Sequence, residues 1–454
     1  MRCLPFVLTA ALLAPSVAPA YAPAPAPAGR LYGLADAVKP AALHETIAAL
    51  VGFGTRQTLS GEISPTRGIV PARAWVRSRF EALSQACGGC LSIETPQDTL
   101  TGPRVPTPTL VQDVLAIQRG SDEPDRVVIV SGHIDSRVTD ILNAASDAPG
   151  ANDDASGVAA VMECARVLSK HRFHATIVYA VLSGEEQGLL GGKILADFAR
   201  SRGWRVEAVL NNDIVGNSHG MDGRVVRDEV RVFSEGTRAD ETAQIAKARR
   251  LRGGELDAPS RELSRYMSAI AGEALPGFHV RQIMRADRFS RGGDQEPMQE
   301  AGYPAVRVTE ADENYTRQHQ DLRTEGAIVY GDVIGGVDFG YLAKVARLDA
   351  LTLAALADAP APPSEVTVAG AVSADTTLRW SSVPGAVAYD VWWRETTDPA
   401  WSRSRRTRSD GAVLKGVNID DFFFGVSARS ADGFESPVVF PGPVGAFFGG
   451  APGG

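Results

Sequence analysis

Five residues between positions 133 and 319 have the side-chain types that hold zinc in hydrolytic enzymes. They are His133, Asp153, Glu186, Asp213 and His319. Imidazole nitrogens and carboxylate oxygens are the usual ligands of catalytic zinc, and a pair of metal ions needs a carboxylate that bridges them. The sequence therefore predicts a site for hydrolytic metal chemistry, built from segments that lie far apart in the chain.

Two more carboxylates stand beside these candidate ligands. Glu185 precedes Glu186, and neighbouring carboxylates cannot easily reach the same atom. One is therefore expected to bind metal, while the other accepts a hydrogen bond from metal-bound water and relays its proton. A solvated acidic turn is the alternative. Asp135 is placed to accept the second ring N–H of His133 and fix its tautomer, unless it only caps a turn.

The elements that must position these side chains are apolar, β-branched runs. Buried strands are predicted at 127–131, 176–182, 206–213 and 305–310, and a candidate residue ends or follows each of them. The carboxyl ends of parallel strands meet at one crevice of an α/β sheet. The predicted fold class is α/β, with a central mixed, mostly parallel sheet flanked by helices.

The pair Asp153-Asp154 opens a predicted helix that runs to about Lys170, with apolar residues spaced along one of its faces. An aspartate before a helix is ordinarily an N-cap, stabilised by the helix dipole. Two adjacent aspartates exceed what one cap needs, so one of them is available for metal. A second helix is predicted from Leu189 to Arg202, after the Glu185-Glu186 turn.

The motifs around these residues resemble those of the co-catalytic zinc aminopeptidase family. That family includes bacterial leucyl aminopeptidases and, more distantly, glutamate carboxypeptidase II. The shared elements are Gly-His133-Ile-Asp135, Asp153-Asp154-Ala-Ser-Gly and Glu185-Glu186-Gln-Gly-Leu-Leu-Gly, and the resemblance covers about 127–321.

The resemblance implies a zinc-peptidase fold that holds two Zn²⁺. His133, Asp153 and Asp213 would hold one ion, and Asp153, Glu186 and His319 the other, so that Asp153 bridges them. Glu185 would be the general base for a hydroxide held between the metals. The Asp153–Asp154 peptide bond is expected to be cis.

The chain departs from the family pattern in two places. Relatives commonly have Ser-Asp-His before the Gly-Tyr-Pro-Ala segment, whereas here Asp294 is followed by Gln295. The late histidine usually lies in His-Thr-x-x-Asp-Thr, but His319 is followed by Gln320-Asp321 and is the only histidine of its loop. Tyr315 is a candidate for the tyrosine that stabilises the oxyanion in some relatives.

The expected function is that of an exported zinc-dependent exopeptidase, an aminopeptidase that hydrolyses N-terminal residues from peptides. A carboxypeptidase on the same fold stays an alternative. Glutaminyl cyclases share the fold but use one zinc, so the presence of both His133 and Asp213 counts against them. Receptor-type binding scaffolds have lost their ligands, and all five are present here.

Composition and the N-terminus agree with an exported enzyme. The net charge of -8 in 454 residues argues against nucleic acid as a partner. Residues 1–22 have one positive charge, a short apolar run and small residues at the end, which is the pattern of a signal peptide too short to span a membrane. An Ala/Pro-rich leader is expected at 23–29. The expected location is secreted or periplasmic, with no membrane-spanning segment.

A Pro-rich linker at 359–363 separates two predicted domains, a peptidase domain at 30–358 and an all-β sandwich at 364–444, followed by a flexible tail at 445–454. The last strand of the sandwich is expected at 433–437. The spacing of Trp380, Tyr389, Trp392 and Phe424 resembles a fibronectin type III module. Because of the linker, we expect the peptidase domain to fold and work alone.

Two features leave alternatives open. The basic run 403–408 could contact an anionic cell surface or another protein, but acidic residues nearby favour a solvated loop. Cys87 and Cys90 could form a local disulfide or remain free thiols, because no second cysteine pair completes a zinc knuckle. Cys164 is expected in the core.

Overall fold

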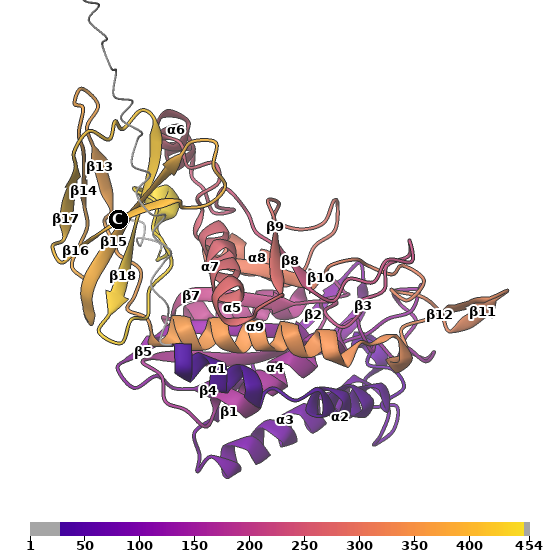
Figure 1. The fold of residues 1–454 in the computed structure, drawn as a ribbon. Coiled ribbons are helices and arrows are strands. Elements are labelled where there is room, and N and C mark those ends of the chain that lie inside the picture. The colour runs from indigo at the N-terminus through magenta and orange to yellow at the C-terminus, as the bar shows by residue number, and fades with distance from the viewer. Residues whose placement is uncertain (1–27, 449–454) are drawn as a thin grey trace, which may run out of the picture.

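A computed structural model, which describes residues 28–448, has a mixed eight-stranded sheet at its centre (Figure 1). The strand order is β1-β4-β6-β5-β7-β10-β8-β9, and the central strands β6, β5, β7 and β10 run parallel. The bounds are β1 Ser92–Glu94, β4 Val114–Gln118, β5 Glu123–His133, β6 Ala175–Leu182, β7 Arg205–Asn212, β8 Glu229–Phe233, β9 His279–Ile283 and β10 Ala305–Glu310.

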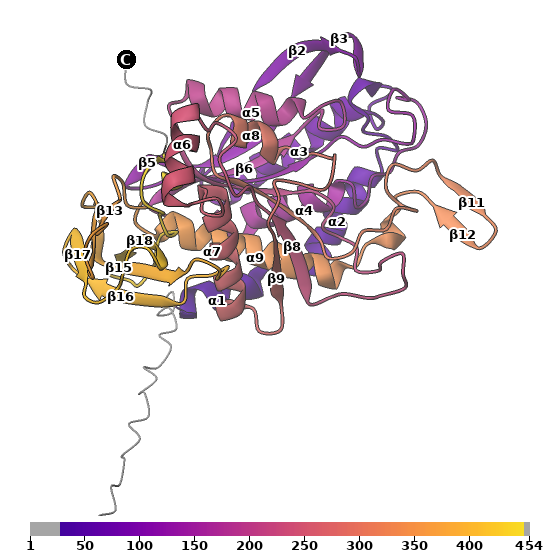
Figure 2. The same cartoon turned by 90° about the horizontal axis from the view of Figure 1, so that it is seen from above.

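Helices cover both faces of this sheet (Figure 2). One face packs against α1 to α4, α7 and α9, and the other packs against α5 and α8. The bounds are α1 Ala28–Ala37, α2 Pro40–Val51, α3 Ile69–Ala86, α4 Ala155–Leu168, α5 Leu190–Ser201, α6 Ala243–Arg252, α7 Pro259–Ala274, α8 Gln295–Glu300 and α9 Phe339–Asp358. The α/β fold class predicted from the sequence is confirmed.

The N-terminal end of α4 lies directly against the sheet. A Cβ atom on Gly157 would come within 2.6 Å of the carbonyl oxygen of Asn212 in β7. Only glycine therefore permits this close approach, which places the Asp153-Asp154 turn beside the ends of β5 and β7.

Two hairpins extend from the peptidase domain. One pairs β2, Gln97–Gly102, with β3, Val105–Gln112. The other pairs β11, Arg323–Glu325, with β12, Ile328–Tyr330, and projects away from the body of the molecule in both views (Figures 1 and 2).

The C-terminal region consists of two antiparallel three-stranded sheets around one apolar core. Trp380, Tyr389 and Phe424 lie in that core. The sheets are β13-β14-β17 and β16-β15-β18, with bounds β13 Thr367–Ala369, β14 Thr376–Arg379, β15 Ala386–Glu395, β16 Arg403–Thr407, β17 Gly411–Leu414 and β18 Phe422–Ser430. This confirms the all-β sandwich, while its likeness to fibronectin type III stays a prediction.

Two predictions within the sandwich are wrong. Residues 433–437 form no strand and contain one isolated β-bridge, between Glu435 and Arg429. The basic run is not a loop but strand β16, where Arg403 pairs with Glu395 and Arg406 with Asp390. These carboxylates on β15 neutralise the arginines and allow a charged segment to join the sheet.

The predicted linker is not exposed. All five residues of 359–363 are buried, and the Ala359 carbonyl accepts a hydrogen bond from Arg126 in the peptidase domain at 2.7 Å. The chain therefore passes from one domain to the other through a packed interface.

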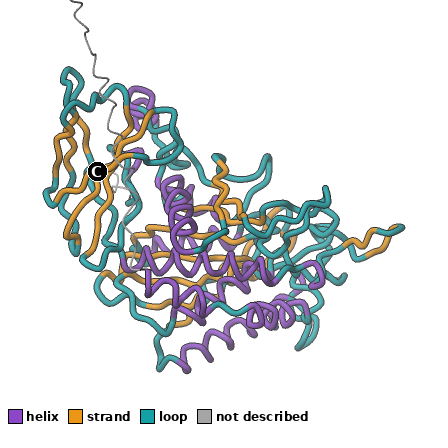
Figure 3. Tube along the Cα trace, in the orientation of Figure 1, coloured by secondary structure: helices purple, strands orange, loops and turns teal. Residues whose placement is uncertain are grey.

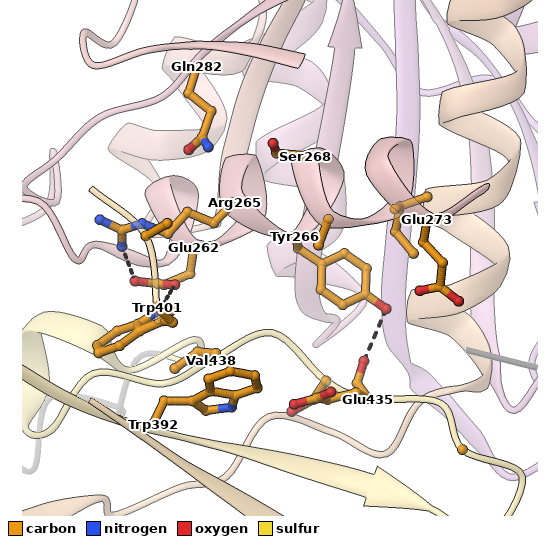
Figure 4. Close-up of a pocket in the computed structure, with 15 residues that line it drawn as sticks. Glu262, Arg265, Tyr266, Ser268, Glu273, Gln282, Trp392, Trp401, Glu435 and Val438 are labelled. Carbon is orange, nitrogen blue, oxygen red and sulfur yellow. Dashed lines mark hydrogen bonds and ion pairs between the residues drawn. The ribbon is translucent and has the colours of Figure 1, made fainter. Parts of the chain in front are cut away.

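That interface centres on helix α7. Glu262 accepts a hydrogen bond from the Trp401 indole at 2.9 Å, and Tyr266 donates one to the Glu435 carbonyl at 3.0 Å (Figure 4). In addition, buried Asp257 pairs with Arg394 of the sandwich at 2.6 Å and with Arg265 of α7 at 3.0 Å. A cavity of about 300 Å³ lies between these contacts. The two domains thus share buried polar interactions, although Arg265 of α7 also pairs with both Asp257 and Glu262.

The predicted terminal segments are only partly described. The signal peptide at 1–22 and residues 23–27 of the leader lie outside the described residues, while residues 28 and 29 begin α1 rather than extend the leader. The predicted flexible tail is wrong for 445–448, because Phe447 is buried and the Ala446 carbonyl binds Arg238. Within 28–448, no helix is long and apolar enough to cross a membrane.

The structure shows the state of Cys87, Cys90 and Cys164. Cys87 and Cys90 form a disulfide at the end of α3, and Cys164 is buried in α4. Figure 3 draws the helices of the chain in purple. The core position predicted for Cys164 is confirmed.

Candidate metal centre

The five predicted ligands meet at the carboxyl ends of the parallel strands. His133 is the last residue of β5, Glu186 lies in the turn after β6, and Asp213 directly follows β7. Asp153 comes from the turn before α4, and His319 from the loop after β10. A cavity of about 530 Å³ opens above them, lined by Asp153, Glu186, Asp213 and His319 together with Glu185. The parallel strands thus deliver side chains to one crevice, as predicted.

Asp153 lies between the two histidines. Its Oδ1 is 3.3 Å from Nε2 of His133, and its Oδ2 is 3.0 Å from Nε2 of His319. Each carboxylate oxygen therefore faces a different histidine, which is the arrangement that a bridging ligand requires. The peptide bond between Asp153 and Asp154 is cis, as the resemblance implied.

Around this carboxylate the ligands separate into two groups. His133 and Asp213 are on one side, with Nε2 and Oδ1 3.9 Å apart. Glu186 and His319 are on the other, with Oε1 and Nε2 3.1 Å apart. A carboxylate oxygen of Glu185 lies within 4.8 Å of the ligand atoms of His133 and Asp213. Glu185 thus lies beside the group of His133 and Asp213, not beside that of Glu186 and His319.

The residues fit metal ions on a further observation. Nε2 of His133 and Oε1 of Glu186 are buried, and within residues 28–448 neither makes a hydrogen bond of acceptable geometry, although a polar atom of opposite type lies within 3.3 Å of each. Buried polar atoms are costly unless they are paired, and the neighbouring carboxylates repel one another without cations between them. Two ions, one in each group, would satisfy both the orphaned atoms and the excess negative charge.

Asp154 caps helix α4 and joins three ligand segments. Its carboxylate accepts hydrogen bonds from the backbone N–H of Gly157 at 2.9 Å, of His133 at 3.0 Å and of Ile214 at 3.2 Å. The division of labour expected for the aspartate pair is therefore present in the geometry, because Asp154 is the cap and Asp153 faces the histidines.

Asp135 acts differently from the sequence prediction. The ring Nδ1 of His133 lies 3.0 Å from the backbone oxygen of Asp135 and 3.5 Å from its carboxylate. The carboxylate instead accepts hydrogen bonds from the backbone N–H of Gly184, Glu185 and Glu186 at 2.9 to 3.3 Å. Asp135 thus orients His133 through its carbonyl and holds the Glu185-Glu186 turn through its side chain.

Asp213 is oriented by a buried arginine. Arg307 in β10 is fully buried and forms an ion pair with Oδ2 of Asp213, which leaves Oδ1 toward His133. Although burial raises the pKa of Asp213, the charge of Arg307 and the contact with His133 outweigh it and hold this pKa below its usual range. Asp213 is therefore an ionised candidate ligand that presents one oxygen toward His133.

Other residues that hold the site were missed by sequence reasoning. Fully buried Arg56 donates to the carbonyls of Ile134, at 2.7 Å, and Gly150, at 2.9 Å, and so connects the segments of His133 and Asp153. Asp332 accepts a hydrogen bond from the Asp153 backbone N–H at 2.7 Å. Neither residue has a local pattern that predicts this contact. Arg307 does have one, because it is a charged residue within a buried apolar strand.

The structure also locates Asp294 and Tyr315. Asp294 is buried and accepts a hydrogen bond from Gly192 at the start of α5 at 3.1 Å, and burial raises its pKa to about 7. Tyr315 is 55% exposed and lines a shallower hollow beside His319, outside the cavity that contains Glu185. Its role at the oxyanion stays a prediction.

The sequence matches a known family and close relatives. The model for peptidase family M28 matches residues 113–327. A protein described as a probable zinc metalloprotease from Pyrenophora teres f. teres is 42% identical over 422 residues, covering 91% of this chain and 87% of that one. A protein with the same description from Leptosphaeria maculans is 41% identical, covering 91% of this chain and 97% of the other. All five candidate ligands fall in the M28 segment.

Solved structures share the fold. The Legionella pneumophila LapA aminopeptidase has a TM-score of 0.52 at 17% identity, covering 73% of this chain and 75% of that one. A leucine aminopeptidase precursor from Bacteroides thetaiotaomicron has a TM-score of 0.50 at 16% identity, covering 70% and 97%.

Proposed function

This chain belongs to peptidase family M28 and is a zinc metallopeptidase, and we propose that it is an exported aminopeptidase that uses two zinc ions. The observation that carries the two-metal proposal is the position of Asp153. Its two carboxylate oxygens lie 3.3 and 3.0 Å from the nitrogens of two different histidines. The solved structures with the same fold include proteins described as aminopeptidases, which supports that choice among peptidases.

In this proposal, His133, Asp153 and Asp213 hold one ion, and Asp153, Glu186 and His319 hold the other. Bound zinc would polarise the scissile carbonyl and make water a better nucleophile near neutral pH. Glu185 accepts a proton from the attacking water and passes it to the departing amine. Its position over the cavity, next to but separate from the second group, supports that role.

Asp135 supports the reaction without touching the substrate. Its carboxylate receives three successive N–H groups of the 184–186 turn, so that Glu185 and Glu186 point in their separate directions. It is therefore a positioning residue in this proposal.

Export is supported by the sequence pattern of residues 1–22, which fits a signal peptide, and by the Cys87–Cys90 disulfide, a bond typical of oxidising compartments. We propose a secreted or periplasmic enzyme. N-terminal sequencing of the mature protein from each cell fraction tests this, and an intact Met1 in the cytoplasmic fraction would contradict it.

The activity is tested with matched substrates. We expect the purified enzyme to cleave leucyl p-nitroanilide and to leave its N-acetyl derivative intact, since an aminopeptidase needs the free amine. Cleavage of N-blocked peptides from their C-terminus, with no cleavage of the anilide, would identify a carboxypeptidase instead.

A further inference from the structure

Two arginines, Arg104 and Arg137, line the metal cavity next to Glu186. Arg104 occupies the turn between β2 and β3 and donates a hydrogen bond to the Glu186 carbonyl at 2.9 Å. Arg137 follows the His133 segment, and its Nη1 lies 3.7 Å from Oε2 of Glu186. Segments far apart in the sequence therefore bring two guanidinium groups to the same side of the cavity.

Neither arginine has a carboxylate of its own. Within residues 28–448, no ion pair joins Arg104 to an acidic side chain, and the only one of Arg137 is with Glu186, a predicted metal ligand. The other hydrogen bonds of Arg137 go to the backbone carbonyls of Val138 and Thr139. Once Glu186 binds a metal, its charge is shared with that ion.

The other arginines of this cavity are different. Arg288 pairs with Asp287 at 3.0 Å, and Arg291 pairs with Glu313 at 2.8 Å. Both are paired with carboxylates that are not candidate metal ligands, and Glu313 is shared by Arg231, Arg288 and Arg291. Glu296 also lines the cavity, but no ion pair joins it to Arg104 or Arg137. Among the arginines that line this cavity, Arg104 and Arg137 are thus the two without an ion pair, within residues 28–448, to a carboxylate outside the candidate ligands.

We propose that Arg104 and Arg137 bind a carboxylate of the substrate, so that this enzyme prefers peptides with a negative charge close to the scissile bond. Guanidinium groups recognise carboxylates through paired charge-assisted hydrogen bonds. The Arg137 side chain is only 15% exposed, which lessens competition from water. This inference rests on the proposed peptidase function and names the substrate class of the same site.

The carboxylate can come from two sources in a peptide. It is either the free α-carboxylate of a very short peptide or the side chain of a glutamate or aspartate next to the cleaved bond. Both sources offer the same group to the arginines, and matched substrates separate them. Leu-Ala is compared with Leu-Ala-amide for the first source, and glutamyl with glutaminyl p-nitroanilide for the second.

The experiment measures kcat/KM for these pairs with the zinc-loaded wild type and with Arg104→Gln, Arg137→Gln and Arg137→Lys. Loss of a charge-assisted contact is expected to reduce kcat/KM for the charged member of one pair by roughly 10- to 100-fold. The uncharged member should change by less than about threefold, and Arg137→Lys should recover part of the loss. Arg79→Gln, on the exposed face of α3, is the matched control.

Equal loss on charged and uncharged substrates would overturn the inference, because it would mean that the arginines act only on Glu186; zinc content measured in parallel would detect that effect. Cleavage of leucyl p-nitroanilide without any preference for a carboxylate would also overturn it, while leaving the aminopeptidase proposal intact. Cleavage of N-acetyl-Ala-Ala alone, reduced in both glutamine variants, would support the carboxylate site and refute the aminopeptidase.

Discussion

At the residue scale, the two members of each adjacent carboxylate pair differ in their contacts. The pairs are Asp153-Asp154 and Glu185-Glu186. Asp154 is tied to three N–H groups while Asp153 faces the histidines. In the turn that Asp135 holds, the Glu186 carboxylate contacts His319, whereas Glu185 lines the cavity. The two members of each pair have the same residue type. The same substitution made at one member is therefore a matched control for the other.

The first prediction uses the pair of glutamates. Glu185→Ala should keep its zinc but lose the proton transfer, a step typically worth about 10²–10⁴-fold in rate. Glu186→Ala should instead weaken one metal, and excess zinc should restore part of the activity. The measurements are zinc content and kcat on leucyl p-nitroanilide. If Glu185→Ala lost a metal while Glu186→Ala remained loaded and inactive, the two roles would have to be exchanged.

At the scale of elements, the sequence predicts the strands and strand ends that a local residue pattern determines. His133 and Asp213 could be placed because each ends or follows a β-branched strand. The length of β5 could not be predicted in the same way. The strand begins at Glu123, and the charged residue Arg126 interrupts the apolar pattern. Arg126 is fully buried there, because Glu123 and Glu207 neutralise it and Glu207 comes from β7. Arg56 and Asp332 contact residues that are distant in the sequence. No local sequence pattern predicts such contacts.

The second prediction concerns helix α9. Asp349 is fully buried in it, and within residues 28–448 it has no ion-pair partner. Burial raises its pKa to about 8. Because the unfolded chain releases this proton near pH 4, Asp349 costs stability progressively as the pH rises from about 4 to about 8.

Asp349→Asn stays neutral at every pH, so this variant should lose less stability than the wild type between pH 5 and pH 8, by on the order of a few kcal/mol. Urea unfolding of the zinc-loaded proteins at several pH values measures this, with the exposed Asp36→Asn as a control. Identical pH dependence of wild type and Asp349→Asn would show that the folded protein does not hold the proton.

At the scale of the whole molecule, the sandwich is part of the packing of the peptidase domain. The Pro-rich segment at 359–363 is predicted to be an interdomain linker, but its residues are buried. Asp257 and helix α7 share polar contacts with Arg394, Trp401 and Glu435. None of the residues that line the metal cavity comes from the sandwich.

The third prediction is therefore that truncation after Asp358 reduces stability more than it reduces catalysis. Loss of Arg394 leaves Arg265 as the only arginine, among the described residues, paired with the two buried carboxylates of Asp257 and Glu262, and incompletely compensated buried charge is destabilising. The melting temperature should fall, while kcat per folded molecule on small substrates should stay close to that of the wild type. Arg394→Met in the full chain tests the same ion pair alone. A truncated protein as stable as the full chain would support the independent domain predicted from the sequence.

The two-zinc assignment is tested most directly by titrating metal into chelated protein while zinc content and activity on leucyl p-nitroanilide are measured together. We predict that chelation abolishes turnover and that full activity returns only as the chain binds two zinc ions, because Asp153 faces a histidine with each oxygen. Full activity with one tightly bound zinc per chain, unchanged by further metal, would contradict the paired site.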